Sequence, residues 1–142
     1  MERYDNLLHS ADVLTARLVA YYAGSGRTPM MKKEIALTIG MSTSAISRID
    51  SIVDQNRYSV RNILMLSQAF RQEDKNLEPG HLLPAKSSYK RVFDLGGKKA
   101  LKELFPEYSG EFTDEFFDSV LQDMFEIEDT RNAHIRTRRN ED

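Results

Sequence analysis

Residues 32–50 read KKEIALTIGMSTSAISRID, and the spacing of their apolar residues is the clearest structural signal in the chain. Its apolar residues recur three or four positions apart, as they do on one face of an amphipathic helix. The pattern is broken once, by Gly40-Met41-Ser42, and therefore predicts two short helices joined by three residues. The apolar residues that define these helices are Met31, Ile35, Ala36 and Ile39 in the first and Ile46 and Ile49 in the second.

The short connection sets conditions on individual residues. A turn of this length needs a residue that can take a positive φ where two helices cross steeply, and Gly40 supplies it. Ala36 is expected where the helices approach most closely, since a larger side chain would push them apart. Ser42 can accept a hydrogen bond from the first turn of the second helix, which is predicted over residues 43–50.

Helices are also predicted on both sides of this pair. Ser10 can cap a helix that ends near Gly24, and Ser59 can cap another. Thr28-Pro29 combines a capping residue with a proline at the first helical position, so the helix that follows is expected to begin there. The inward-facing apolar residues of the flanking helices are Val13, Leu14, Leu18, Val19 and Tyr22 in the first and Ile63, Leu66, Ala69 and Phe70 in the last.

In its order of residue types, this central stretch resembles the helix-turn-helix of the lambda-repressor-like (Cro/CI, Xre) family. Members typically have alanine, glycine and isoleucine at the spacing of Ala36, Gly40 and Ile46. Residues 58–70 look like the closing helix of the family, and the resemblance covers residues 10–72. Two features depart from it: Lys32 stands where many members have a glutamine that braces the reading helix, and the loop after Asp50 is slightly longer.

The resemblance implies an all-α, lambda-repressor-like domain whose second motif helix enters the major groove of DNA. That groove is wide enough for a helix and presents a distinguishable pattern of donors and acceptors at each base pair. Arg48 could then make two hydrogen bonds to O6 and N7 of a guanine. The implied base-reading residues are Thr43, Ser44, Ser47 and Arg48. The implied contacts to the DNA backbone are Lys32, Lys33, Ser42, Arg57, Arg61 and Asn62.

Charge and helix-breaking residues divide the chain near residue 75. Residues 1–70 hold eight basic and six acidic residues, net +2, whereas residues 71–142 hold twelve and sixteen, net −4. Residues 75–90 contain Pro79-Gly80 and Pro84, which is typical of a linker or an irregular connection. The expected organisation is a helix-turn-helix DNA-binding domain over 1–74, a linker over 75–90, a helical region over 91–130 and a mobile tail over 131–142. The four arginines of the tail could also contact the DNA backbone.

The helical region is expected to form two helices. One runs from Lys98 to Phe105, and the other starts at Thr113 with acidic residues in its first turn. The second helix is too apolar for a single stripe, so it could meet a second subunit or another protein, although packing within the chain would also explain it. The residues expected at such a contact are Phe116, Phe117, Val120, Leu121, Met124 and Phe125. Residues 111–129 carry eight acids and no base, which suits either a solvated face or a docking surface for a basic partner.

Composition argues against several classes of function. The 142 residues include no cysteine, and His9, His81 and His134 are far apart, so neither a metal nor another cofactor is expected. An enzyme is not expected, because no acid–base pair, phosphate-binding glycine loop or partnered nucleophile is found. No apolar run approaches the roughly 18 residues of a membrane span, and the start lacks a signal peptide, so no membrane contact and a cytoplasmic location are expected. The net charge of −2 does not exclude DNA binding, because positive charge can be local.

Together these features predict a sequence-specific DNA-binding transcription regulator of bacterial, phage or plasmid type, acting as a repressor. A homodimer on a two-fold-symmetric operator in double-stranded DNA is expected, because one short helix contacts too few base pairs to select a genomic site. The alternative is a protein-interaction module, such as an antitoxin or an anti-repressor, that uses the apolar C-terminal helix.

Overall fold

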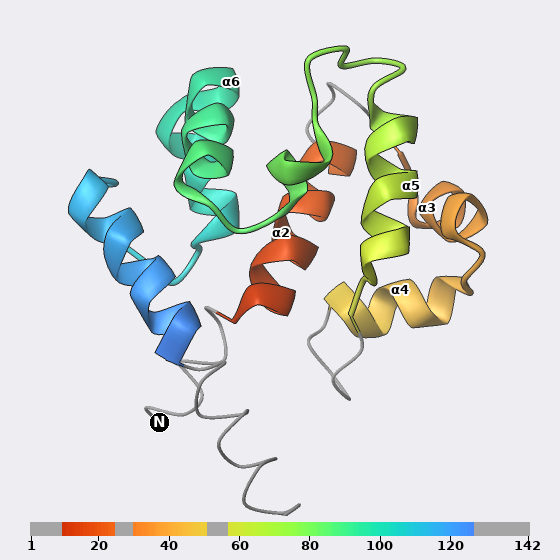
Figure 1. Cartoon of the computed structure of the whole chain (residues 1–142), viewed down its shortest axis with the longest axis horizontal. Helices are drawn as coiled ribbons and strands as arrows, with labels where there is room; N and C mark the ends of the chain where they lie inside the picture. The colour runs from red at the N-terminus through yellow and green to blue at the C-terminus, as the bar shows by residue number, and fades with distance from the viewer. Residues whose placement is uncertain (1–9, 25–29, 51–56, 127–142) are drawn as a thin grey trace, which may run out of the picture.

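The computed structural model describes residues 10–24, 30–50 and 57–126, and these segments are all-α, without a strand. The elements in chain order are α2 (Ala11–Gly24), α3 (Lys32–Ile39), α4 (Thr43–Asp50), α5 (Val60–Phe70), the 3₁₀ helix η1 (Pro79–Leu82) and α6 (Lys86–Leu104). A last helix covers residues 114–126 and is drawn in blue in Figure 1. The expected all-α class is therefore confirmed.

Four hydroxyl side chains begin helices where the sequence predicts it, whereas the predicted cap Thr28 lies outside the described residues. Each of the four accepts a hydrogen bond from a backbone N–H in the first turn of its helix, which satisfies a group that has no partner inside the helix. The four bonds are Val13 N–H to Ser10 Oγ at 3.4 Å, Ala45 N–H to Ser42 Oγ at 3.1 Å, Asn62 N–H to Ser59 Oγ at 3.1 Å and Phe116 N–H to Thr113 Oγ1 at 3.1 Å.

The start of α3 differs from the prediction. Thr28-Pro29 lies outside the described residues, and the helix begins at Lys32. Met31 has an extended backbone with φ −75° and ψ 159°, and its N–H donates to Glu34 Oε1 at 3.4 Å. The preceding Met30 N–H donates to the Ala23 carbonyl at 3.0 Å. The backbone before Lys32 therefore ties α3 to the end of α2 instead of forming a helical turn.

The turn between α3 and α4 has the predicted conformation. Gly40 takes the left-handed conformation with φ 71° and ψ 35°. Its N–H and that of Met41 both donate to the Ala36 carbonyl, the latter at 2.9 Å. Ala36 is buried, and α3 packs against both α4 and α5. In Figure 1, α3 is seen nearly along its axis whereas α4 lies across the view, so the two helices cross steeply.

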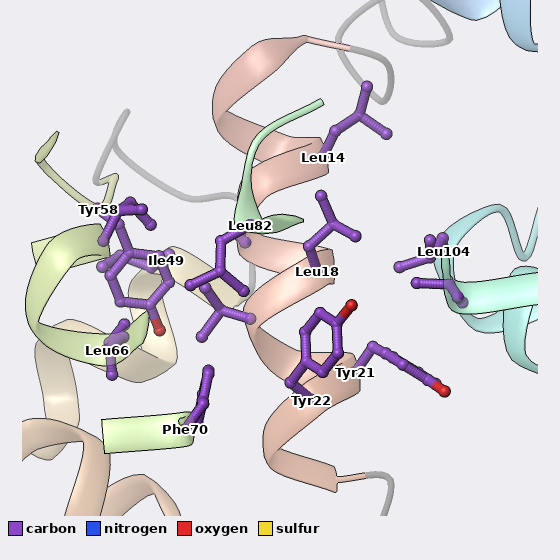
Figure 2. Close-up of a cluster of buried hydrophobic side chains, with 14 of the residues drawn as sticks. Leu14, Leu18, Tyr21, Tyr22, Ile49, Tyr58, Leu66, Phe70, Leu82 and Leu104 are labelled. Atoms are coloured by element: carbon purple, nitrogen blue, oxygen red, sulfur yellow. The ribbon is translucent and has the colours of Figure 1, made fainter. Parts of the chain in front are cut away.

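The core is one continuous cluster built around α2, which contacts α4, α5, η1 and α6. Leu18 and Tyr22 of α2, Leu66 and Phe70 of α5, and Leu82 of η1 are all fully buried within it (Figure 2). Because the cluster continues into α6 and the helix over 114–126, residues from both halves of the sequence share one hydrophobic interior.

The segment predicted as a linker, residues 75–90, belongs to this interior. Leu77 and Leu82 are fully buried, and α6 already begins at Lys86. Ser88, in the first turn of α6, shares its hydroxyl proton between the carbonyls of Gly80 at 2.9 Å and Leu83 at 2.7 Å. The connection is irregular in its first part, as expected, but it does not act as a spacer between separately packed regions.

Helix α6 is longer than predicted because it consists of two limbs. Gly97 interrupts it with φ 71° and ψ −160°, a conformation that only glycine adopts readily. The second limb, up to Leu104, corresponds to the predicted helix from Lys98. The first limb, residues 86–96, was not expected as a helix, and it buries Ser88, Tyr89 and Val92.

A buried ion pair joins the end of α5 to α6 and α2. Arg91 Nη2 lies 2.7 Å from both carboxylate oxygens of Asp74, and Arg91 Nη1 donates to the Tyr22 hydroxyl at 2.7 Å. The guanidinium also lies over the Tyr22 ring, 5.4 Å from its centroid. Burial raises the pKa of Tyr22, although Arg91 opposes this change, so the phenol stays protonated.

Candidate nucleic-acid interface

Helix α4 is fixed to the core along one side only. Ile46 and Ile49 are 0% and 2% exposed, and successive residues of a helix are rotated by about 100°. Residues 44, 47 and 48 therefore face away from the core, and residue 43 lies at the edge of that face. Thr43, Ser44 and Arg48 are exposed and Ser47 is half-buried. Three of the residues predicted to read bases thus lie on the outward face of α4, and the fourth, Thr43, is exposed at its edge.

Three cations on the helices α3, α4 and α5 are exposed and lack a partner in the described parts of the chain. They are Lys33 in α3, Arg48 in α4 and Arg61 in α5. A guanidinium or ammonium group in water keeps its charge and its hydrogen-bond donors available for an incoming anion. The basic residues of α6 are arranged differently, since three of its lysines form ion pairs. These pairs are Lys86 with Asp118 at 2.8 Å, Lys90 with Asp114 at 3.6 Å and Lys98 with Glu111 at 3.3 Å.

Lys32 is already engaged within the protein. Its Nζ lies 3.4 Å from Ser47 Oγ and 3.7 Å from Asp50 Oδ2, so the side chain bridges the start of α3 to the last turn of α4. Burial raises the pKa of the Asp50 carboxyl, and Lys32 lowers it in opposition. The sequence predicted Lys32 as a phosphate contact but did not reveal its contact with Asp50, because the two residues are 18 positions apart.

Two residues predicted to contact phosphates take part in helix caps. Ser42 is exposed, and its Oγ accepts the Ala45 N–H, which leaves its own hydroxyl proton available to an anion. Asn62 is only 8% exposed, and its Oδ1 accepts the Ser59 N–H at 2.9 Å. The prediction for Asn62 is therefore corrected: this side chain stabilises the start of α5 and is not presented to solvent.

The last predicted phosphate contact, Arg57, is exposed and precedes α5. Its Nη1 lies 4.0 Å from Asp12 Oδ2 of α2, at the outer limit of an ion pair. An exposed pair at this separation contributes little to stability and is readily exchanged for another anion. Arg57 therefore remains compatible with a contact at the edge of the interface.

Tyr58 supports α4 from behind and was not identified from the sequence as part of the site. It is 7% exposed and shares the buried cluster with Ile49 and Leu66 (Figure 2). Its hydroxyl has no hydrogen-bond partner among the described residues. Burial, with a smaller contribution from Asp50, raises the pKa of Tyr58, so the phenol is neutral at physiological pH.

The helix over residues 114–126 packs its apolar side against the rest of the protein and exposes its polar side. Phe117, Val120 and Met124 are buried, Phe116 and Leu121 are half-buried, and Phe125 is 59% exposed. The aromatic rings pack against one another: Phe117 stacks on Tyr89 at 5.4 Å and Phe116 on Tyr108 at 3.9 Å between centroids. The predicted partner surface is thereby reduced to the neighbourhood of Phe125, and packing within the chain accounts for the rest.

Among residues 10–24, 30–50 and 57–126, no three histidine or acidic side chains gather as a metal site would require. In that part of the chain, no helix combines the length and apolar character needed to cross a bilayer. Comparison with known proteins gives no match, whether with protein-family models, with curated proteins or with solved structures.

Proposed function

We propose that this protein is a sequence-specific DNA-binding transcription regulator of the helix-turn-helix type, with α4 as the reading helix. The observation that carries the proposal is the one-sided attachment of α4. Its two isoleucines hold it to the core, while Arg48 and two serines face outward and a threonine is exposed at the edge of that face. The major groove, about 12 Å wide, admits a helix of this kind.

The residue types on α4 suit the edges of bases. Arg48 can donate two hydrogen bonds to O6 and N7 of a guanine, and no other ion pair or hydrogen bond in the described residues competes for it. Hydroxyl groups of Thr43, Ser44 and Ser47 can donate or accept, so they suit less exacting contacts. Arg48 is accordingly the residue to which we assign the main base contact.

The surrounding residues suit the sugar-phosphate backbone. Lys33 of α3 and Arg61 of α5 have no ion-pair partner among the described residues, and the Ser42 hydroxyl lies at the N-terminus of α4. Positive charge and N-terminal helix groups favour phosphate without distinguishing one sequence from another. These residues would fix the register of α4 in the groove.

Selection of one site in a genome requires more base pairs than one helix of eight residues can contact. We therefore infer a homodimer that reads two half-sites about 34 to 36 Å apart on one face of the duplex. By occupying such an operator the protein would act as a repressor.

Selection of bound fragments from a random double-stranded DNA library, followed by sequencing, tests this proposal. The expected result is an enriched motif with two-fold symmetry. The logarithm of the binding constant for this motif should fall linearly with the logarithm of the salt concentration between about 50 and 200 mM. Enrichment of no motif, together with binding that does not depend on salt, would overturn the proposed function. Sedimentation of the protein with the selected duplex would give the number of bound subunits.

A further inference from the structure

The contact between Lys32 and Asp50 bears on how tightly the proposed interface can bind. Two acids, Glu34 and Asp50, lie in the described residues of α3 and α4. Glu34 accepts the Met31 N–H and so belongs to the start of α3. Asp50 instead faces Lys32, with Asp50 Oδ2 3.7 Å from Lys32 Nζ.

The local electrostatics favour keeping the Lys32 ammonium on α4. Asp50 is the last residue of α4, where the helix dipole places partial negative charge in addition to the carboxylate. Ser47 Oγ lies 3.4 Å from the same Nζ. The lysine therefore has two acceptors within the protein, while its side chain is still 54% exposed and can be reached by another anion.

The adjacent lysine gives an internal comparison. Lys33 is also exposed and also lies in the first turn of α3, but no acceptor in the described residues holds it. A phosphate that approaches α3 meets one free ammonium at Lys33 and one at Lys32 that must first exchange its carboxylate partner. Lys32 and Lys33 carry the same charge, but the Lys33 ammonium is more readily available to a DNA phosphate.

We propose that Asp50 limits the DNA affinity of the protein by competing with phosphate for Lys32. This inference rests on the proposed function and adds to it a residue that sets the strength of binding. Because non-specific and specific complexes both depend on phosphate contacts, Asp50 would weaken both. The protein would then dissociate more readily from one DNA site and move to another.

A double-mutant cycle on the full chain tests the inference. Affinity for the selected duplex and for a scrambled duplex is measured at several salt concentrations for wild type, Asp50→Asn, Lys32→Met, the double variant and, for comparison, Lys33→Met. Asp50→Asn should bind both duplexes about two- to fivefold more tightly, the size expected when an exposed ion pair is released. Its log–log salt slope should steepen by about 0.9, corresponding to one added phosphate contact. Lys32→Met should change affinity less than Lys33→Met.

Two controls separate a specific effect from a general change of charge. Glu73→Gln makes the same charge change in the turn that follows the C-terminal end of α5, away from α4 (Figure 1), and should leave the affinity nearly unchanged. Asp50→Glu keeps the carboxylate and should retain the wild-type slope. Circular dichroism melting shows that each variant is folded before it is titrated.

The outcomes distinguish the inference from the function on which it rests. Two results together support the inference and the proposed function. Wild-type protein binds DNA in a salt-dependent manner, and Asp50→Asn increases the DNA affinity in the wild-type background but not in the Lys32→Met background. The same gain in both backgrounds, or no gain at all, overturns the role of Asp50 and leaves DNA binding intact. Wild-type protein that binds neither duplex contradicts the proposed function and this inference together.

Discussion

Arg91 and Asp74 form a buried ion pair in which one guanidinium nitrogen binds both carboxylate oxygens. One guanidinium nitrogen lies 2.7 Å from each carboxylate oxygen, and the Asp74 and Arg91 side chains are 1% and 14% exposed. Such a pair gains much of its Coulomb energy only by giving up hydration, so its net contribution to stability is small, whereas the loss of one partner is costly. Substitution of one partner should therefore lower the free energy of unfolding far more than the intact pair raises it.

Asp74→Ala should lower the free energy of unfolding by about 3 to 5 kcal/mol, because it leaves the Arg91 charge buried without a counter-ion. Urea denaturation followed by circular dichroism measures this. Asp114→Ala removes the exposed partner of Lys90 and should cost no more than about 1 kcal/mol. A similar loss in the two variants would contradict the assignment of Asp74 as a buried charge.

Gly40→Ala should destabilise the protein by about 1 to 2 kcal/mol, because an alanine at φ 71° brings its Cβ too close to the backbone. Apart from the residue itself and its two chain neighbours, no atom lies within 4 Å of the added Cβ, so the cost comes from the local backbone conformation and not from crowding by other residues. Gly24→Ala is the matched control, since that glycine also has open space but no positive φ. Thermal melting of both variants checks the difference, and equal melting temperatures would refute it.

Tyr58→Phe should raise the free energy of unfolding by about 1 kcal/mol. Its hydroxyl is buried without a partner among the described residues, and an unsatisfied buried polar group is costly. Tyr22→Phe should have the opposite effect, because it removes the hydroxyl that accepts from Arg91. Chemical denaturation compares the two, and a clear loss of stability in Tyr58→Phe would show that its hydroxyl has a partner after all.

Stability should fall as the pH decreases from about 7 to 5, with a contribution from His81. Its Nδ1 accepts the Glu78 N–H at 2.8 Å, which requires an unprotonated nitrogen. Burial, followed by Arg91, lowers the pKa of His81, and Glu78 and Asp74 oppose this shift. A base with a lowered pKa in the folded state binds fewer protons than in the unfolded state. Its stabilising effect is therefore complete above the ordinary value of about 6.5 and is lost as the pH falls through the folded pKa.

His81→Asn tests this pH dependence. An asparagine can accept the same backbone N–H, as Asn62 does from Ser59 at the start of α5, but it does not titrate. The variant should lose less stability than wild type between pH 7 and 5 in denaturation measured at several pH values. Parallel curves for the two proteins would exclude His81 as the source.

Arg48→Ala should weaken binding to the selected operator by about 1 to 3 kcal/mol and relax the preference at one base pair. Lys33→Ala should weaken binding to all sequences similarly, since phosphate carries no sequence information. Fluorescence titration with the operator, single-base variants and a scrambled duplex distinguishes these effects. Equal losses on operator and scrambled DNA for Arg48→Ala would remove it from the base-reading group.

Local features of the fold were predictable from the sequence. Capping serines, the bounds of α4 and the positive φ of Gly40 depend on interactions between residues a few positions apart, which a sequence pattern records. The start of α3 was predicted wrongly because Met30 is held by Ala23 of another helix. The buried connection around Ser88 was missed because its hydroxyl is satisfied by carbonyls brought near only by the fold.

The candidate site shows the same division. An exposed polar face on α4 follows from the positions of Ile46 and Ile49 along one helix. The partners of individual side chains do not follow from the sequence. Asn62 accepts the Ser59 N–H at the start of its own helix, and Lys32 pairs with Asp50 of the next helix. Residue type and spacing therefore predict which face is available, whereas the availability of each charge depends on tertiary contacts.

Helix α2 lies between two groups of helices: it contacts α4 and α5 on one side and α6 on the other (Figure 1). Arg17 strengthens the second contact by donating to the Leu104 carbonyl at 2.8 Å. Dissection of the chain after residue 74 would consequently strip α2 of half its covering, and we do not expect the excised N-terminal fragment to be an autonomous folding unit. If α4 reads DNA as proposed, its packing depends on residues of the C-terminal half, so destabilising substitutions in that half should also weaken DNA binding.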